Sequence, residues 1–211
     1  MAQALIRELG DAGFSMAQLA ARAGVSPATP YNLLGTKSEV LRLVVREEFD
    51  NFEGRLAAVR STSPLARLLE ATALVVTHYE ADRPFYRGLY RAALSVEAGE
   101  MRHLMSAAGR ALWRALVADA VESGELAASV VAQPLTDLLL LTIAATTQAW
   151  LADGWTHERF ALSMAGAVRL VLASVASAPW RDRLVQEAMA AHAELSQLSE
   201  ADRPARRAGV G

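Results

Sequence analysis

Apolar residues recur every three or four positions along most of this sequence, which is the spacing of one face of an α-helix. No stretch shows convincing strand alternation, and no internal repeat is visible. The pattern predicts an all-α fold of about nine or ten helices, with three in a small N-terminal head and the remainder in a larger bundle. The expected helices lie at 2–9, 16–23, 27–34, 36–60, 64–81, around 85–90, and at 101–123, 134–152, 157–176 and 180–198.

Capping signals delimit the short helices of the head. Ser15 with Gln18, and then Thr36 with Glu39, have the spacing of capping boxes, in which each side chain binds the other residue's backbone amide. Gly24 is suited to the left-handed conformation that closes a helix. These signals predict one helix that ends at Gly24 and a longer one that begins after Thr36.

The helix between them has an unusual start. We expect Ser26 to be its N-cap and Pro27 its first residue, where no amide hydrogen is needed. Pro30 would then lack the amide that makes the first intrahelical bond to the Ser26 carbonyl. Pro30 also disfavours a helical conformation at Thr29. The helix, which ends at Gly35, should therefore start tightly or with a kink.

Two short helices joined by a glycine-containing turn are typical of the helix-turn-helix, whose second helix enters the major groove of DNA. An ordinary helical hairpin in an all-helical core would have the same spacing. The spacing alone leaves both interpretations open.

The residues of this segment closely resemble the DNA-binding cassette of the TetR family of transcriptional regulators. The similarity is specific from about Ile6 to Val45, and beyond it only length and helical layout agree. Its matching elements are Gly13-Phe14, Leu19-Ala20, Ala23-Gly24-Val25-Ser26, Tyr31, and Gly35-x-Lys37 leading into Val40-Leu41. Pro30 and Leu34 depart from the family, which usually has a branched aliphatic and an aromatic residue at these positions.

The resemblance implies a homodimer that binds double-stranded operator DNA and responds to a small molecule, most often as a repressor. Lys37, the only lysine in the chain, lies where free helix amides also attract phosphate. In relatives, the residues that match Tyr31 and Lys37 commonly touch the DNA backbone, although a core tyrosine and a solvated lysine are the alternative. Ala28 and Thr29 could meet thymine methyls, and Asn32 could pair with adenine. The full expected DNA-binding set is Ser15, Met16, Ser26, Pro27, Ala28, Thr29, Tyr31, Asn32, Thr36 and Lys37.

Composition narrows the other possibilities. The chain has 211 residues, 53% of them hydrophobic, with no cysteine and a formal net charge of −2. The absence of thiols excludes disulfides and thiol catalysis and makes a structural zinc site unexpected. Up to Arg46 there are five Lys/Arg and three Asp/Glu, so any DNA affinity depends on a small local excess of positive charge.

The Ser61–Pro64 segment is the clearest boundary, with Ser63 as the cap of the next helix. We expect a DNA-binding domain at 1–46, with a connecting helix to about 60, an effector-binding and dimerisation domain at 63–198, and a disordered tail at 199–211. The apolar helices at about 134–152 and 157–176 are the expected homodimer surface; filling of the monomer core is the alternative. Their arginines, Arg159 and Arg169, should lie at the rim or in solvent.

The middle helices concentrate aromatic and adaptable side chains, which suit a pocket for a small, largely apolar effector. They are also compatible with an ordinary core. The candidates are His78, Tyr79, Tyr86, Tyr90, His103, Trp113, Thr147 and Gln148. We expect no cofactor and no metal ion.

Two rival classes of function remain. An enzyme is not expected, because the four histidines lack metal-site spacing and the chain has no glycine-rich phosphate loop. A dimeric helical adaptor with weak or lost DNA binding is conceivable because of Pro30 and the small positive excess. The charged N-terminal residues and the lengths of the apolar stretches favour a soluble cytoplasmic protein that does not enter a membrane.

Overall fold

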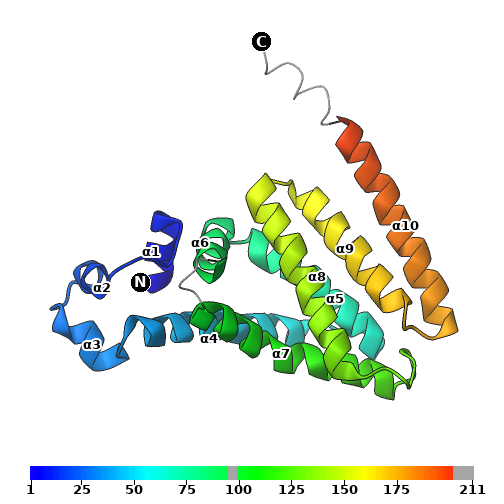
Figure 1. Ribbon diagram of the computed structural model, residues 1–211, viewed down its shortest axis with the longest axis horizontal. Coiled ribbons are helices and arrows are strands. Elements are labelled where there is room, and N and C mark those ends of the chain that lie inside the picture. Colours follow the sequence, from blue (N-terminus) through cyan, green and yellow to red (C-terminus); the bar gives the residue numbers. More distant parts are fainter. Residues whose placement is uncertain (95–98, 202–211) are drawn as a thin grey trace, which may run out of the picture. The chain divides into compact units, whose positions relative to one another are not determined.

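A computed structural model describes the backbone of residues 1–94 and 99–201 and the side chains of residues 1–92 and 109–198. The described part of the chain forms ten α-helices, which confirms the all-α prediction (Figure 1). They are α1 (Ala2–Leu9), α2 (Met16–Ala23), α3 (Ala28–Leu34), α4 (Lys37–Ala58), α5 (Pro64–Glu80), α6 (Arg83–Leu94), α7 (Gly99–Glu122), α8 (Ala132–Asp153), α9 (His157–Ala173) and α10 (Ala178–Ala201).

Contacts group the chain into two compact units. The first contains Met1–Ala58 and His78–Leu112, and the second contains Val59–Thr77 and the chain from Trp113 onward. The two units are defined by which residues pack together, not by function. The functional division into a DNA-binding domain at 1–46 and an effector domain at 63–198 stays a prediction.

The first unit has a core built from α1, α2, α4 and α6. Its buried side chains include Ile6, Phe14, Val44 and Phe85. Helix α1 lies very close to α6, because a Cβ added at Gly88 would come within 2.9 Å of the Ile6 carbonyl oxygen. Only a glycine on α6 permits this approach without a shift of α1.

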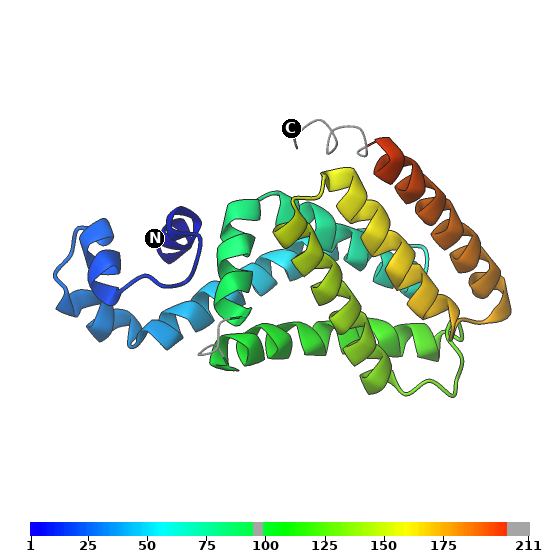
Figure 2. The same cartoon turned by 45° about the horizontal axis from the view of Figure 1, so that its top comes forward.

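In the second unit, α9 packs against both α8 and α10, and Figure 2 shows α9 and α10 running side by side. The Trp150 and Phe160 rings stack with their centroids 4.6 Å apart and join α8 to α9. Arg169 donates from Nε to Glu187 at 2.8 Å and joins α9 to α10. Arg169 is therefore partly buried within the chain and not free in solvent, and its expected place at the rim of a dimer stays a prediction.

Two further helices start with a side-chain cap, of which the one at Ser63 was predicted. The Ser63 hydroxyl accepts a bond from the Ala66 amide at 3.2 Å, and the Thr156 hydroxyl accepts from the Arg159 amide at 3.2 Å. The last helix begins at Ala178 rather than Trp180, because Pro179 is tolerated in its first turn.

Helix α10 continues to Ala201, so the expected disordered tail is wrong at residues 199–201. The remainder of that tail, residues 202–211, lies outside the described residues.

Helix α8 is longer at both ends than the helix expected from the apolar stretch at 134–152. Among the described helices it is the one that is long and apolar enough to cross a membrane by length and composition alone. Only 39% of its most apolar window is buried within the chain. Much of its apolar surface is thus left for solvent or for a partner.

Candidate DNA-binding surface and effector site

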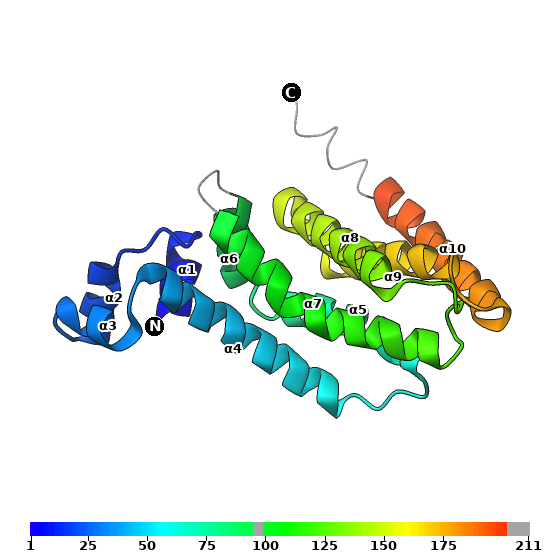
Figure 3. The same ribbon diagram turned by 60° about the horizontal axis from the view of Figure 1, so that its bottom comes forward.

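Helices α2 and α3 form the helix-turn-helix in the first unit, directly before α4 (Figure 3). The Ser15 hydroxyl accepts from the Gln18 amide at 3.1 Å, and the Ser15 amide donates to the Gln18 side chain at 2.7 Å. Gly24 has φ 68° and ends α2 in the left-handed conformation that glycine adopts without strain. The capping box and the glycine turn are both confirmed.

The start of α3 differs from the expected one. Pro27 already has helical angles, and the Ser26 hydroxyl pairs with the Thr29 hydroxyl at 2.8 Å rather than with a backbone amide. The Ser26 carbonyl instead accepts from the Thr29 amide at 3.0 Å, three residues on. Pro30 has no amide hydrogen to donate to the Ser26 carbonyl, but this carbonyl already accepts a bond from Thr29. The tight start is confirmed, whereas the side-chain cap and the non-helical Thr29 are wrong.

Most of the expected DNA-contacting side chains lie at the surface. Tyr31 is 56% exposed, which excludes the alternative of a core tyrosine, and Asn32 and Ala28 are also exposed. Pro30 is the buried residue of α3 and points into the head. Met16 is also buried, so its side chain belongs to the core and not to a DNA-binding surface.

The start of α4 carries the remaining candidates. The Thr36 amide donates to the Glu39 carboxylate at 2.6 Å and the Glu39 amide donates to the Thr36 hydroxyl at 3.3 Å, which confirms the second capping box. The Thr36 hydroxyl also donates to Glu39 at 2.9 Å, and the bonds from Thr36 lower the pKa of the Glu39 carboxyl. The hydroxyl proton of Thr36 is therefore already donated to Glu39 within the chain. Lys37 Nζ lies 5.2 Å from the centroid of the Phe14 ring, within the range of a cation–π contact. This contact fixes the stem of Lys37 at the edge of the helix-turn-helix.

Two of the basic residues of the head are neutralised by carboxylates. Arg22 donates from both terminal nitrogens to Glu8, at 2.5 and 2.6 Å, and Arg7 donates from Nε to Asp82 at 2.7 Å. The other basic residues of the head, Lys37, Arg42 and Arg46, all lie in the first half of α4.

The head also has an apolar surface feature that was not predicted from the sequence. Leu33 is 77% exposed and lies with Leu34 and Leu43 along an open groove of about 620 Å³ between α3 and α4. The sequence held one sign of this feature. Leu33 and Leu34 are adjacent on a seven-residue helix, so they cannot both face the same core, and one of them had to be exposed.

Four of the proposed effector-binding residues lie together in the first unit. The Tyr79 ring centroid is 4.3 Å from that of Tyr86 and 6.0 Å from that of Tyr90, and the His78 ring lies 5.6 Å from Tyr86. Burial, with a smaller contribution from Tyr90, raises the pKa of Tyr79 well above its usual range. The four residues therefore form a mutually packed aromatic cluster.

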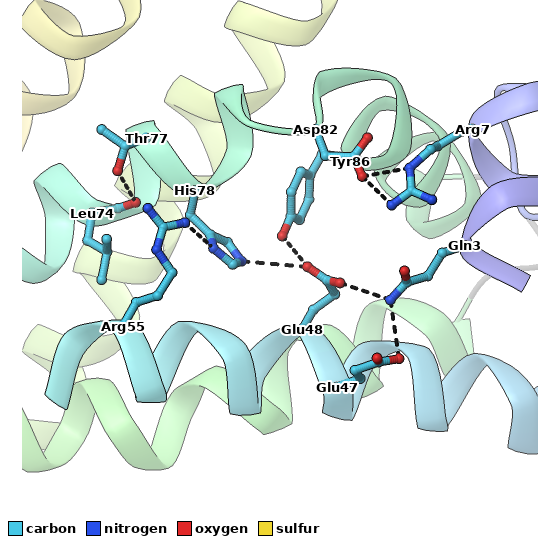
Figure 4. Close-up of polar contacts among 10 residues, drawn as sticks. All are labelled: Gln3, Arg7, Glu47, Glu48, Arg55, Leu74, Thr77, His78, Asp82 and Tyr86. Atoms are coloured by element: carbon cyan, nitrogen blue, oxygen red, sulfur yellow. Dashed lines mark hydrogen bonds and ion pairs between the residues drawn. The ribbon is translucent and has the colours of Figure 1, made fainter. Parts of the chain in front are cut away.

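Two members of this cluster, His78 and Tyr86, direct polar atoms at Glu48 of α4 (Figure 4). The Tyr86 hydroxyl donates to Glu48 Oε2 at 2.5 Å, and His78 Nε2 lies 3.6 Å from the same oxygen. His78 Nδ1 lies 2.9 Å from Arg55 Nη1. Because arginine can only donate, Nδ1 accepts, and the ring proton of neutral His78 faces Glu48. Gln3 of α1 also donates to Glu48, at 3.1 Å.

This network changes the ionisation of its members. Burial opposes ionisation of Glu48, but the contacts from His78 and Tyr86 outweigh it, and the Glu48 pKa is lowered. Burial and then the Glu48 carboxylate raise the pKa of Tyr86. Glu48 is therefore a charged acceptor that ties α4 to α1, α5 and α6 within the first unit.

The other proposed effector-binding residues are not part of this cluster. Trp113, Thr147 and Gln148 belong to the second unit, and the side chain of His103 lies outside the described residues. Thr147 is fully buried, and its hydroxyl has no hydrogen-bond partner in the described part of the chain. Such a group is costly unless something binds it. No set of three or more His, Asp or Glu side chains that could hold a metal ion occurs among the described residues.

Solved structures with a similar fold are known, although comparisons of the sequence alone find no match. No family model matches the sequence, and no curated protein matches it. Three crystal structures are similar to it: a putative TetR-family transcriptional regulator from Rhodococcus sp. (TM-score 0.65, 20% identity, 81% of this chain and 94% of that one), RolR without ligand (0.63, 18%, 88% and 92%), and a gamma-butyrolactone receptor described as ArpA-like (0.56, 17%, 92% and 93%). At these identities the likeness concerns architecture, and it extends over most of each chain. The chain has the fold of the TetR-family transcriptional regulators.

Proposed function

We propose that this protein is a dimeric DNA-binding transcriptional regulator, a repressor that a small, largely apolar effector releases from its operator. The main support is the helix-turn-helix of the first unit, in which α3 exposes Tyr31 and Asn32 and is followed at once by Lys37. Exposed polar groups at this position suit a recognition helix rather than a core hairpin. The likeness to a TetR-family regulator over most of the chain supports the same function.

Backbone contacts should dominate over direct base recognition. Lys37 and the Tyr31 hydroxyl are the proposed phosphate contacts, with the Ser15, Ser26 and Thr36 regions beside them. Pro27, Ala28, Thr29 and Asn32 would face the bases, and none of them is an arginine for guanine. We therefore expect A·T-rich half-sites.

DNA binding is tested by fluorescence anisotropy with fragments from the promoter of the protein's own gene and with random-sequence DNA. The wild type should prefer the promoter, and Lys37→Ala and Tyr31→Phe should weaken binding to both DNAs. Arg114→Ala, an exposed arginine on α7, is the matched control and should bind as the wild type does. Equal affinity of the wild type for promoter and random DNA would contradict the proposal.

Dimerisation is proposed through α8 and α9. Leu141 is 67% exposed and Leu138 49%, and Ala145 continues the same exposed line along α8 at spacings of three and four. Such a stripe suits a helix that packs against a partner helix. Sedimentation velocity should show a dimer for the wild type and a monomer for Leu141→Glu. Leu43→Glu, an exposed leucine of α4, is the control, and a monomeric wild type would refute the proposal.

A dimer also fits the geometry of DNA recognition, since two helix-turn-helices must reach half-sites about 34 Å apart. A regulator of this kind acts in the cytoplasm, which is the proposed location.

The effector site is proposed at one of two places, either the aromatic cluster of the first unit or the buried polar groups of the second. Thr147 supports the second location, because its buried hydroxyl lacks a partner in the described part of the chain. The test is a thermal-shift screen of small aromatic and aliphatic compounds, followed by release of labelled operator DNA. A hit that stabilises the protein should release DNA; stabilisation without release for every hit would refute an effector role.

A second candidate is a dimeric adaptor of the same fold with weak or lost DNA binding. It is favoured by the ion pairs of Arg7 and Arg22, which reduce the positive charge that the head can offer DNA. A robust dimer that selects no motif from a pool of genomic fragments would support the adaptor and exclude the regulator.

A further inference from the structure

A concentration of positive charge in the first unit lies on α6 and not on the recognition helix. Arg83, Arg87 and Arg91 follow one another at intervals of four on α6, so they share one face of that helix. Arg7 of α1 joins them. Like charges at this spacing repel, and α6 carries no Asp or Glu to offset them.

The four arginines line a concave pocket. Its volume is about 240 Å³, and its remaining walls are Gly10 and Pro84, with no acidic residue among them. Arg91 lies over Gly10, because its Nη1 is 3.6 Å from the point where a Cβ on Gly10 would be. The missing side chain at Gly10 keeps this end of the pocket open.

Part of this charge is satisfied within the chain, and part is not. Arg7 is paired with Asp82 at 2.5 Å. Arg87, by contrast, has a buried Nε with no hydrogen-bond partner in the part of the chain that the structure describes. The lining thus has four arginines and no acidic residue, in a protein whose net charge is −2. An anion is the ligand that would satisfy both the orphan donor and the excess charge.

We propose that this pocket between α1 and α6 binds a compact phosphoryl anion, either free phosphate or the phosphate group of a small metabolite. Arginine forks donate two parallel hydrogen bonds to phosphate oxygens, which makes them well suited to this group. The volume lies below the roughly 300–1,000 Å³ of pockets for drug-sized ligands, so a small, highly charged group fits better than an apolar effector.

The pocket also differs from a DNA-binding surface. Its guanidinium groups converge on one concave site from two helices, whereas duplex DNA offers a line of singly charged phosphates. The proposal does not depend on the proposed regulatory function, since the site would bind phosphate with or without an operator.

The test is isothermal titration of the full-length protein with sodium phosphate in a chloride buffer, with sodium chloride at matched ionic strength as the blank. A nucleoside 5′-monophosphate is titrated separately. One phosphate should bind per chain; tighter binding of the nucleotide would identify the phosphate group of a metabolite, and weaker binding would identify free phosphate. No heat beyond the chloride blank from either anion would overturn the proposal.

Variants localise the site. Arg87→Gln should weaken phosphate binding at least about tenfold, the loss expected for a charged hydrogen bond. Arg87→Lys, which keeps the charge but not the fork, should be intermediate, and Arg114→Gln should bind as the wild type does. Circular dichroism confirms that each variant is folded. Unchanged phosphate binding by Arg87→Gln, or a shallower salt dependence of its DNA binding, would overturn the proposal, the latter by assigning Arg87 to DNA.

Discussion

Replacing Tyr86 by phenylalanine tests the Glu48 network most directly. The substitution removes one hydroxyl, which donates to the Glu48 carboxylate at 2.5 Å, and leaves the buried ring in place. A hydrogen bond to a charged group contributes about 1.5–3 kcal/mol to the free energy of unfolding. Because Glu48 and Tyr86 are both shielded from solvent, we expect the loss to lie in this range. For a chain of this size it corresponds to a fall in Tm of about 3–12 °C.

The effect of pH follows from the lowered pKa of Glu48. A carboxyl whose pKa is depressed in the folded state contributes stability above its unfolded pKa, about 4.3, and loses it as the pH falls through the folded value. Once Glu48 is protonated, Tyr86 donates to a neutral acceptor, and a neutral hydrogen bond contributes only about 0.5–1.5 kcal/mol. The difference between the wild type and Tyr86→Phe should therefore narrow below about pH 4.

Urea unfolding at pH 7 and at acid pH, followed by circular dichroism, measures this difference. The control is Tyr31→Phe, the same chemical change at an exposed site, which should alter stability by less than about 0.5 kcal/mol at either pH. If Tyr86→Phe is as stable as Tyr31→Phe at pH 7, the Tyr86–Glu48 bond does not stabilise the fold. If the loss of stability is the same at both pH values, the charge of Glu48 does not strengthen that bond.

Four further substitutions test other parts of the structure. Lys37→Ala should make the salt dependence of DNA binding shallower by about 0.9 per lysine, or about 1.8 for a dimer, on promoter and random DNA alike; an unchanged slope would remove Lys37 from the phosphate contacts. Gly88→Ala should destabilise by about 1–3 kcal/mol in urea unfolding, because its Cβ would crowd the Ile6 carbonyl, whereas Gly54→Ala, with nothing within 4 Å, should stabilise by about 0.5–1 kcal/mol. Equal effects of the two glycine substitutions would show that α1 can move away from α6. Thr147→Val should stabilise by about 1–3 kcal/mol in the absence of ligand, since it removes a buried hydroxyl that has no partner in the described chain, and a loss of stability would show that a water or a ligand satisfies it.

Local chemistry explains what the sequence predicted well. The Ser15–Gln18 and Thr36–Glu39 capping boxes each depend on residues three apart, so they form wherever the helix forms. The start of α3 was less predictable, because several arrangements could satisfy the Ser26 carbonyl. The structure uses the Thr29 amide, in a first turn where Pro30 is buried within the head.

Long-range pairing explains what the sequence could not predict. The aromatic residues of the middle helices were expected to line one pocket, but helical periodicity does not say which faces meet. Four of them pack together around Glu48, a residue that carries no motif and was not singled out. The arginine pocket was missed for the same reason, since Arg7 and Arg87 are brought together only by the packing of α1 on α6.

The two compact units carry different fluorophores. All four tyrosines, Tyr31, Tyr79, Tyr86 and Tyr90, belong to the first unit, and all four tryptophans, Trp113, Trp150, Trp155 and Trp180, belong to the second. Light at the long-wavelength edge of the tryptophan absorption band excites tryptophan and not tyrosine. The fluorescence it produces therefore reports on the second unit alone. The near-ultraviolet dichroism of tyrosine follows the first. Unlabelled wild-type protein can thus show whether its two halves melt together or in sequence, and which of them an added ligand protects.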